Sequence, residues 1–132
     1  MSIPSENIVN LTPHTVRLLD LNGATWGHWP SAGEARASAN RKVVDTVVVK
    51  GVVEQGARAG KEWSEEFPVY RVAFGPVEGL PEPMPGVAYI VSRIAAESAR
   101  AQGRATADLL IPDDIVRGPD GQPIGCRSFA TL

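Results

Sequence analysis

Thirteen glycines and eleven prolines cut this chain of 132 residues into short segments. Glycine allows backbone angles that other residues avoid, and proline cannot donate a backbone hydrogen bond, so both tend to end regular structure. The segments between them are too short for long helices and favour strands joined by turns. The strongest strand signal is residues 46–53, which are rich in β-branched valine.

Further strands are predicted on either side of that segment. Residues 34–40 are expected to form a strand that leads into a turn, and residues 67–74 alternate as a half-buried strand does. The polar residues 55–66, which include two glycines, are expected to form an exposed loop.

The last third of the chain predicts one main helix. Ser92 is a typical N-cap residue, residues 93–102 are good helix formers, and Gly103 is a common helix terminator. Apolar segments at 87–91 and 108–111 flank this helix and complete a βαβ unit, whose strands are nearly always parallel.

A β-hairpin is expected to follow the βαβ unit. Its strands are residues 115–117 and 124–129, and the Gly-Pro-Asp-Gly sequence at 118–121 supplies the turn. The predicted class is therefore α+β, with a mixed, mostly antiparallel sheet, one main helix in a C-terminal βαβ unit and a final β-hairpin. The length fits a single domain over residues 1–132.

Composition narrows the classes of function. The 43% of hydrophobic and 21% of charged residues are ordinary for a globular protein. The net charge is −2 and the basic residues are spread along the chain, which disfavours general nucleic-acid binding because phosphate recognition needs a basic surface.

The sequence also bears on the cellular compartment in which the protein is expected. No segment approaches the roughly 20 apolar residues needed to span a bilayer, and the N-terminus lacks the basic start and apolar run of a signal peptide. A lone cysteine, Cys126, permits no intramolecular disulfide. We therefore expect a cytoplasmic protein without membrane association.

Four polar residues are predicted to meet at one edge of the sheet, where the parallel strands of the βαβ unit end. They are Ser92, Arg93, Asp113 and Asp114. A helix N-terminus favours an anion, Arg93 adds a bidentate donor, and the aspartates are able to bind a cation or accept protons. Each residue also has a structural interpretation, Ser92 as a helix cap and the aspartates as a turn or as partners of Arg93 or Arg117.

His14 is a second candidate, within the motif Asn-Leu-Thr-Pro-His at residues 10–14. Imidazole titrates near neutral pH and suits a general base. Asn, Thr and Pro are turn and cap formers, however, and favour a polar cluster that holds a break between strands. The structural interpretation is the stronger one, because the sequence shows no catalytic partner for His14.

No metal or cofactor is predicted. One cysteine and two distant histidines lack the paired spacing of a zinc site, and a magnesium or calcium site built from Asp108, Asp113 and Asp114 is the remaining alternative. The sequence contains no Walker loop and no GxGxxG, GxSxG or HExxH motif. Cys126 is interpreted as a small core residue rather than a nucleophile.

Several short motifs are spread over most of the chain. They are Asn-Leu-Thr-Pro-His at 10–14, Pro-Val-Tyr at 68–70, Gly-Leu-Pro-Glu-Pro at 79–83, Tyr-Ile-Val-Ser at 89–92, Ile-Pro-Asp-Asp at 111–114 and Ile-Gly-Cys-Arg at 124–127. With these motifs the chain resembles a family of small uncharacterised proteins found in bacteriophages and bacterial genomes. The resemblance implies a phage or mobile-element accessory protein in bacterial cytoplasm, and it implies no catalytic or binding residues.

Three hypotheses of function follow. The first is a non-enzymatic accessory module that binds a host protein or a small anionic ligand in the cytoplasm of a bacterium or phage-infected host cell. The second is a small hydrolase or phosphate-directed enzyme that uses His14 with Asp113 or Asp114. The third is a structural or assembly role in a homo-oligomer, in which exposed strand edges pair between copies.

Overall fold

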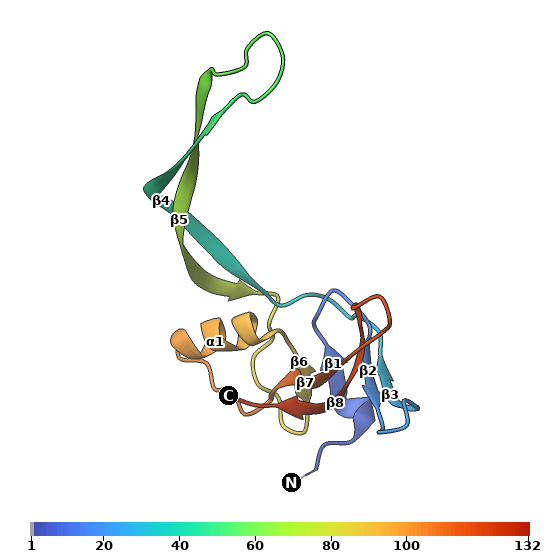
Figure 1. Cartoon of the computed structure of the whole chain (residues 1–132). Coiled ribbons are helices and arrows are strands. Elements are labelled where there is room, and N and C mark those ends of the chain that lie inside the picture. Colours follow the sequence, from blue (N-terminus) through green and yellow to red (C-terminus); the bar gives the residue numbers. More distant parts are fainter. Residues whose placement is uncertain (1) are drawn as a thin grey trace. The chain divides into compact units, whose positions relative to one another are not determined.

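The computed structural model describes residues 2–132 and divides the chain into two compact units (Figure 1). Residues 2–38 and 74–132 form the first, called the core unit here, and residues 39–73 form the second, called the ribbon. The core unit contains every buried residue of the described chain, because no residue of the ribbon is buried.

The core unit is built on a six-stranded sheet with the strand order β1-β6-β7-β8-β2-β3. Its elements, in chain order, are η1 (Ser5–Asn7), β1 (Ile8–Asn10), β2 (Val16–Leu19), β3 (Thr25–Trp29), β6 (Ala88–Ile90), α1 (Arg93–Ala101), β7 (Leu109–Arg117) and β8 (Pro123–Ala130). The predicted α+β class with a single main helix is confirmed for the described residues.

The sheet is mixed. β1 pairs parallel with β6, β6 with β7, and β8 with β2, whereas β2–β3 and β7–β8 are antiparallel. The two antiparallel ladders hold more of the paired residues than the three short parallel ones, because β7 and β8 stay paired from Ile111–Ala130 to Arg117–Pro123.

Helix α1 connects the parallel neighbours β6 and β7. It begins where the Ser92 hydroxyl accepts a hydrogen bond from the Ala95 amide at 3.1 Å, as an N-cap residue does. It ends before Gly103, whose φ of 86° only glycine adopts easily. The local signals of the sequence therefore set both ends of this helix.

The turn expected at residues 112–114 is wrong. β7 runs without interruption through these residues, because Asp113 pairs with Ser128 of β8 and Pro112 pairs with Phe129. Asp114 adapts to this path with a φ of 50°, in the left-handed region that aspartate tolerates better than most residues. The two short strands predicted at 108–111 and 115–117 are thus one strand.

The core packs on both faces of the sheet. On one face, alanines of α1 approach the sheet closely, since they have no bulk beyond Cβ, and pack against Leu11, Ala35, Tyr89, Val91, Leu109 and Ile111. The other face has a smaller cluster of Val16, Ile90 and Cys126, over which the rings of Trp29 and Phe129 meet edge to face at 5.7 Å.

A buried amide joins the two edge strands of this sheet. Asn10 of β1 is 1% exposed, and its Nδ2 donates to the carbonyls of His14 at 2.7 Å and of Trp29, in β3, at 2.9 Å. Its Oδ1 accepts from the Thr12 amide at 2.9 Å and the Thr12 hydroxyl at 2.7 Å. The break between β1 and β2 is thus held by one fully bonded side chain.

Replacing Asn10 by Ala is expected to lower the free energy of unfolding by about 2–3 kcal/mol, because the groups bonded to it lose their partners inside the protein. Urea denaturation followed by circular dichroism measures the change. Asn22→Ala, at an exposed turn position, is the matched control and is expected to stay within about 0.5 kcal/mol of the wild type. Equal stability of the two variants would contradict this account.

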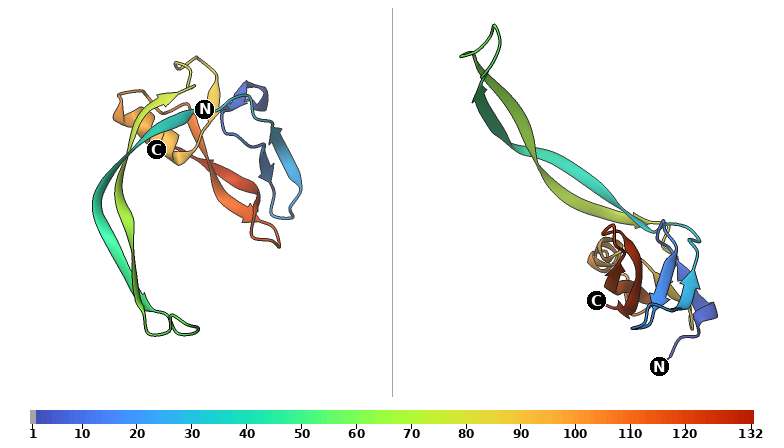
Figure 2. Two further views of the ribbon diagram at one scale, coloured as in Figure 1. Left: turned by 90° about the horizontal axis from the view of Figure 1, so that it is seen from above. Right: turned by 45° about the vertical axis from the view of Figure 1, so that its right-hand side comes forward.

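The ribbon is the middle of a two-stranded sheet formed by β4 (Arg36–Val52) and β5 (Glu62–Glu78). Figure 2 shows the two strands coiling around each other. The turn expected after residues 34–40 is wrong, because β4 continues through residues that include neither glycine nor proline until Gly51. The loop expected at 55–66 is shorter, since β5 already begins at Glu62.

Side chains of β4 and β5 contact one another across the ribbon. The Trp63 indole covers Gly51, filling the space that a side chain at this glycine would take. The Arg41 guanidinium lies 4.3 Å from the centre of the Tyr70 ring, a cation–π contact. The hairpin closes where the Val53 amide donates to the Lys61 carbonyl at 2.9 Å and Gly60 donates back to Val53 at 2.8 Å.

Among residues 2–132 there is no helix with the length and apolar character needed to cross a lipid bilayer.

Candidate functional site

The two halves of the predicted edge site lie at one end of the β6–β7 pair. Ile90 pairs with Leu110 in the parallel register, so Ser92 comes level with Pro112, next to Asp113. Ser92 uses its hydroxyl to cap α1. Arg93 is exposed and its guanidinium lies 3.9 Å from Glu97, a weak ion pair along the helix surface. These features fit the structural interpretation of both residues.

Asp113 and Asp114 do not form the turn that was predicted at the edge of the sheet. Asp113 lies within the β7–β8 ladder and its Oδ2 accepts a hydrogen bond from the Ser128 hydroxyl at 3.2 Å. Asp114 is exposed and distinguished by its positive φ angle. Asp113 is therefore partnered by β8 rather than by Arg93 or Arg117.

His14 is exposed two residues before the start of β2, and its backbone carbonyl accepts hydrogen bonds from Asn10 and Thr12. His14 helps to line a surface hollow together with residues 15–17, Pro112 and residues 122–125. Neither Asp113 nor Asp114 lines this hollow. The strand break at His14 is held by the Asn10 side chain, which fits the structural interpretation of the motif.

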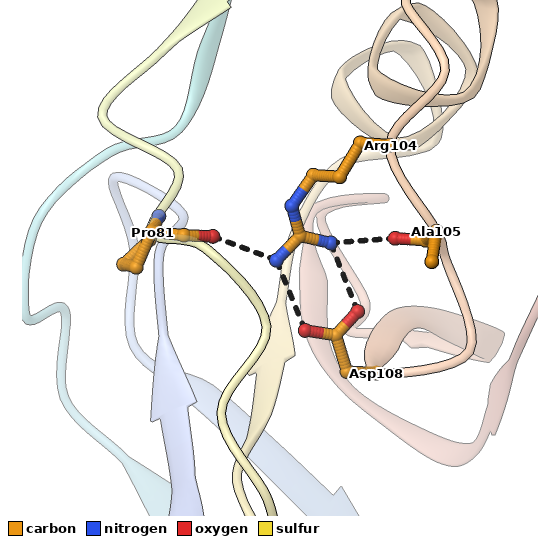
Figure 3. Close-up of polar contacts among 4 residues, drawn as sticks. All are labelled: Pro81, Arg104, Ala105 and Asp108. Atoms are coloured by element: carbon orange, nitrogen blue, oxygen red, sulfur yellow. Dashed lines mark hydrogen bonds and ion pairs between the residues drawn. The ribbon is translucent and has the colours of Figure 1, made fainter.

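Asp108 is bound by an arginine rather than left open for a cation (Figure 3). Arg104 donates to both carboxylate oxygens of Asp108, at 2.9 and 3.0 Å, and to the carbonyls of Ala105 at 2.8 Å and Pro81 at 2.7 Å. Its guanidinium thereby ties the proline-rich segment before β6 to the segment before β7. Within residues 2–132, no group of three histidine, cysteine or acidic side chains is placed to hold a metal ion.

Replacing Arg104 by Ala is expected to lower the free energy of unfolding by about 3 kcal/mol, since it leaves the Asp108 carboxylate buried without its counter-charge. The side chains of this pair are 13% and 14% exposed. Arg93→Ala is the matched control, because the Arg93–Glu97 side chains are 56% and 51% exposed, and it is expected to change stability by less than about 0.5 kcal/mol. Chemical denaturation distinguishes the two, and equal losses would remove Arg104 from this role.

Cys126 lies in the core, 1% exposed, with its Sγ 3.6 Å from the Arg17 carbonyl. Burial raises the pKa of the Cys126 thiol, because the thiolate would lose its hydration. A buried thiol with a raised pKa is a poor nucleophile at neutral pH.

Ellman's reagent is therefore expected to label Cys126 in the native protein only as fast as the core unit opens, and to label it at once in denaturant. The rate of thionitrobenzoate release at pH 7 measures this directly. Rapid labelling of the folded protein would show that Cys126 is accessible.

Most of the exposed large apolar side chains of the described chain lie in the ribbon. Eleven large apolar side chains in it are each 37% to 54% exposed: Val43, Val44, Val47, Val48, Val49, Val52, Trp63, Phe67, Val69, Tyr70 and Val72. Neighbouring residues of a strand point to opposite faces. The consecutive valines at 43–44 and 47–49 therefore place apolar side chains on both faces, and neither face is covered.

The ribbon is nearly neutral. Residues 39–73 contain six basic and five acidic side chains. A surface of this composition offers no excess of positive charge to phosphate groups.

The two edges of the ribbon differ. β4 has no proline along its whole length, whereas β5 contains Pro68 and Pro76. Proline lacks the amide needed for a ladder hydrogen bond and protects an edge against pairing. β4 is therefore the open edge.

Sequence reasoning missed this surface, because it treated residues 46–53 and 67–74 as strands of one packed sheet. The signal was the run of consecutive valines, which no half-buried strand needs on both faces. Comparisons with protein-family models, curated proteins and solved structures found no match for this chain.

Proposed function

We propose that this protein is a non-catalytic binding and assembly module that docks onto a protein partner through the ribbon. The observation that carries this proposal is the exposure of apolar side chains on both faces of residues 39–73. Exposed apolar surface of this extent marks interaction sites in folded proteins.

The energetics of a two-stranded sheet support the proposal. Such a sheet is marginally stable alone in water, and it gains stability when more strands or another body cover a face. Burying apolar surface stabilises an association by about 25 cal/mol for each Å² removed from water. The aromatic rings of Trp63, Phe67 and Tyr70 are of the kinds that contribute most at protein interfaces.

Charge supports a protein partner over a nucleic acid. The ribbon carries an excess of a single positive charge, from six basic and five acidic side chains. A nucleic-acid contact of this length would need several unopposed cations. The accessory role in a bacterial or phage-infected cell that the motif resemblance implies agrees with docking onto a protein.

The chain offers a direct chemical report of ribbon contacts, because its three lysines, Lys42, Lys50 and Lys61, all lie in the ribbon. An amine-reactive crosslinker applied to bacterial cells that express the tagged full chain is expected to join these lysines to a second protein. Peptide mass spectrometry identifies both sides of each crosslink.

The variant Phe67→Ser with Val69→Thr is expected to reduce the yield of these crosslinks by at least about tenfold, since it removes two apolar contacts of the ribbon. The matched control, Ile94→Ser with Ile115→Thr, changes two core-unit side chains of similar exposure, 46% and 44%, and is expected to crosslink like the wild type. Unchanged crosslinking of the ribbon variant, or no ribbon crosslink in the wild type, would overturn the proposal.

A further inference from the structure

Resting on the proposed function, we infer that the partner is a protein with a groove that encloses the ribbon and covers both of its faces. The groove has two apolar walls, and the wall over one face presents a carboxylate to Arg41. Because sheets pack about 10 Å apart face to face, the two walls lie roughly 20 Å from each other.

Two contacts across the ribbon show which strand alternates regularly. The Trp63 ring fills the space beside Gly51, and the Ser38 hydroxyl lies beside Gly75. These contacts are 13 positions apart in β4 and 12 positions apart in β5, so β4 contains one extra residue between them. The extra residue interrupts the alternation of side chains in β4, whereas β5 keeps it. β5 therefore shows which side chains share a face.

Both faces of β5 carry exposed apolar side chains. Trp63, Phe67 and Val69 lie on one face, called the first face here, and Tyr70 and Val72 lie on the second face. The exposed fractions are 37% to 53% on the first face and 41% and 47% on the second. Val69 and Tyr70 are adjacent in the chain, so the two faces are apolar at the same level of the ribbon. The coiling of the strands (Figure 2) therefore does not bring these two side chains to one side.

A flat partner surface covers only one of these faces. No residue of the ribbon is buried by its own chain. Contact with a single wall would leave the apolar side chains of the other face in water, and the hydrophobic contribution to binding grows with the apolar area that is removed from water. A groove supplies the second wall within the same partner.

Arg41 gives the second face a polar contact. Its guanidinium lies 4.3 Å from the centre of the Tyr70 ring. Stacking on an aromatic ring uses the flat side of a guanidinium and leaves the N–H groups at its edge available. These groups match the two oxygens of a carboxylate, which accepts two parallel hydrogen bonds from them. A glutamate or aspartate in the wall over the second face is therefore the group that fits Arg41.

Charge along the ribbon supports the same arrangement. The part joined to the core unit, residues 39–50 and 67–73, has four basic side chains and one acidic one. The hairpin end, residues 51–66, has four acidic side chains and two basic ones. A groove that receives the hairpin end is complementary when its interior is basic and its mouth is acidic. Complementary charges steer association and fix the orientation of the two partners.

Site-specific photocrosslinking tests whether one partner contacts both faces. The photoreactive residue p-benzoylphenylalanine replaces Phe67 on the first face or Val72 on the second, in the tagged full chain expressed in bacterial cells. Mass spectrometry is expected to identify the same second protein in the adducts of both positions. Ile115, which is 44% exposed in the core unit, is the matched control position and is expected to give no adduct with that protein.

The other outcomes separate the groove from the proposed function. Adducts from one face only would overturn the groove and leave docking through the ribbon standing. Adducts of the chain with a second copy of itself, or with a different protein at each face, would also overturn a single enclosing partner. The absence of adducts from both positions would overturn the groove and the proposed function together.

Replacement of Arg41 tests the carboxylate. Arg41→Gln is expected to lower the adduct yield from position 67 at least about tenfold, because the carboxylate of the partner loses its counter-charge. Arg71→Gln is the matched control, since it removes the same charge from an exposed residue on the first face of β5. It is expected to change the yield by less than about twofold. Circular dichroism is expected to show the wild-type spectrum for both variants. Equal losses in the two variants, or none in Arg41→Gln, would overturn the contact between Arg41 and a carboxylate.

Discussion

A two-stranded sheet has no interior, and the ribbon of residues 39–73 is built entirely within that limit. In the core unit, β6 has a neighbour on each edge and a packed cluster on each face, so Ala88, Tyr89 and Ile90 are at most 3% exposed. Each strand of the ribbon has one neighbour, and its consecutive valines point to opposite faces. Only surface supplied from outside the ribbon can cover them. The function that we propose follows from this constraint, because the residues with the highest β-propensity lie where they are unable to form a core.

The edges of the two sheets show the same contrast. The edge strands of the core unit, β1 and β3, have three and five residues, and the Asn10 amide bridges them by bonding to the Trp29 carbonyl. Short, bridged edges offer little backbone to another chain. β4 has 17 residues with no proline. The edge strands of the core unit are therefore short and bridged, whereas β4 is long and lacks proline. This arrangement is expected if β4 has a partner.

The parts of the fold that were predictable from sequence are those set by local chemistry. Ser92 and Gly103 fix the ends of α1, and the Gly-Pro-Asp-Gly turn joins β7 to β8. The turn expected at Pro112-Asp113-Asp114 failed because cross-strand pairing with Ser128 and Phe129 outweighs local turn preference. Ser92 and Asp113 lie at the same end of the β6–β7 pair. Capping of α1 by Ser92 was predictable, whereas the bond from the Ser128 hydroxyl to Asp113 was not, because it depends on the pairing of β7 with β8. The exposure of the ribbon was missed for a related reason. Strand propensity indicates that a segment forms a strand, but not whether other residues cover its faces.

The lysines of the ribbon bear on how its exposed edge avoids aggregation. An unpaired strand edge rich in valine promotes aggregation. Charged side chains on edge strands oppose pairing with arbitrary chains. All three lysines of the protein lie in the ribbon, and two of them, Lys42 and Lys50, belong to β4 itself. Lys42 and Lys50 therefore lie on the proline-free strand itself, where their charges oppose pairing with arbitrary chains.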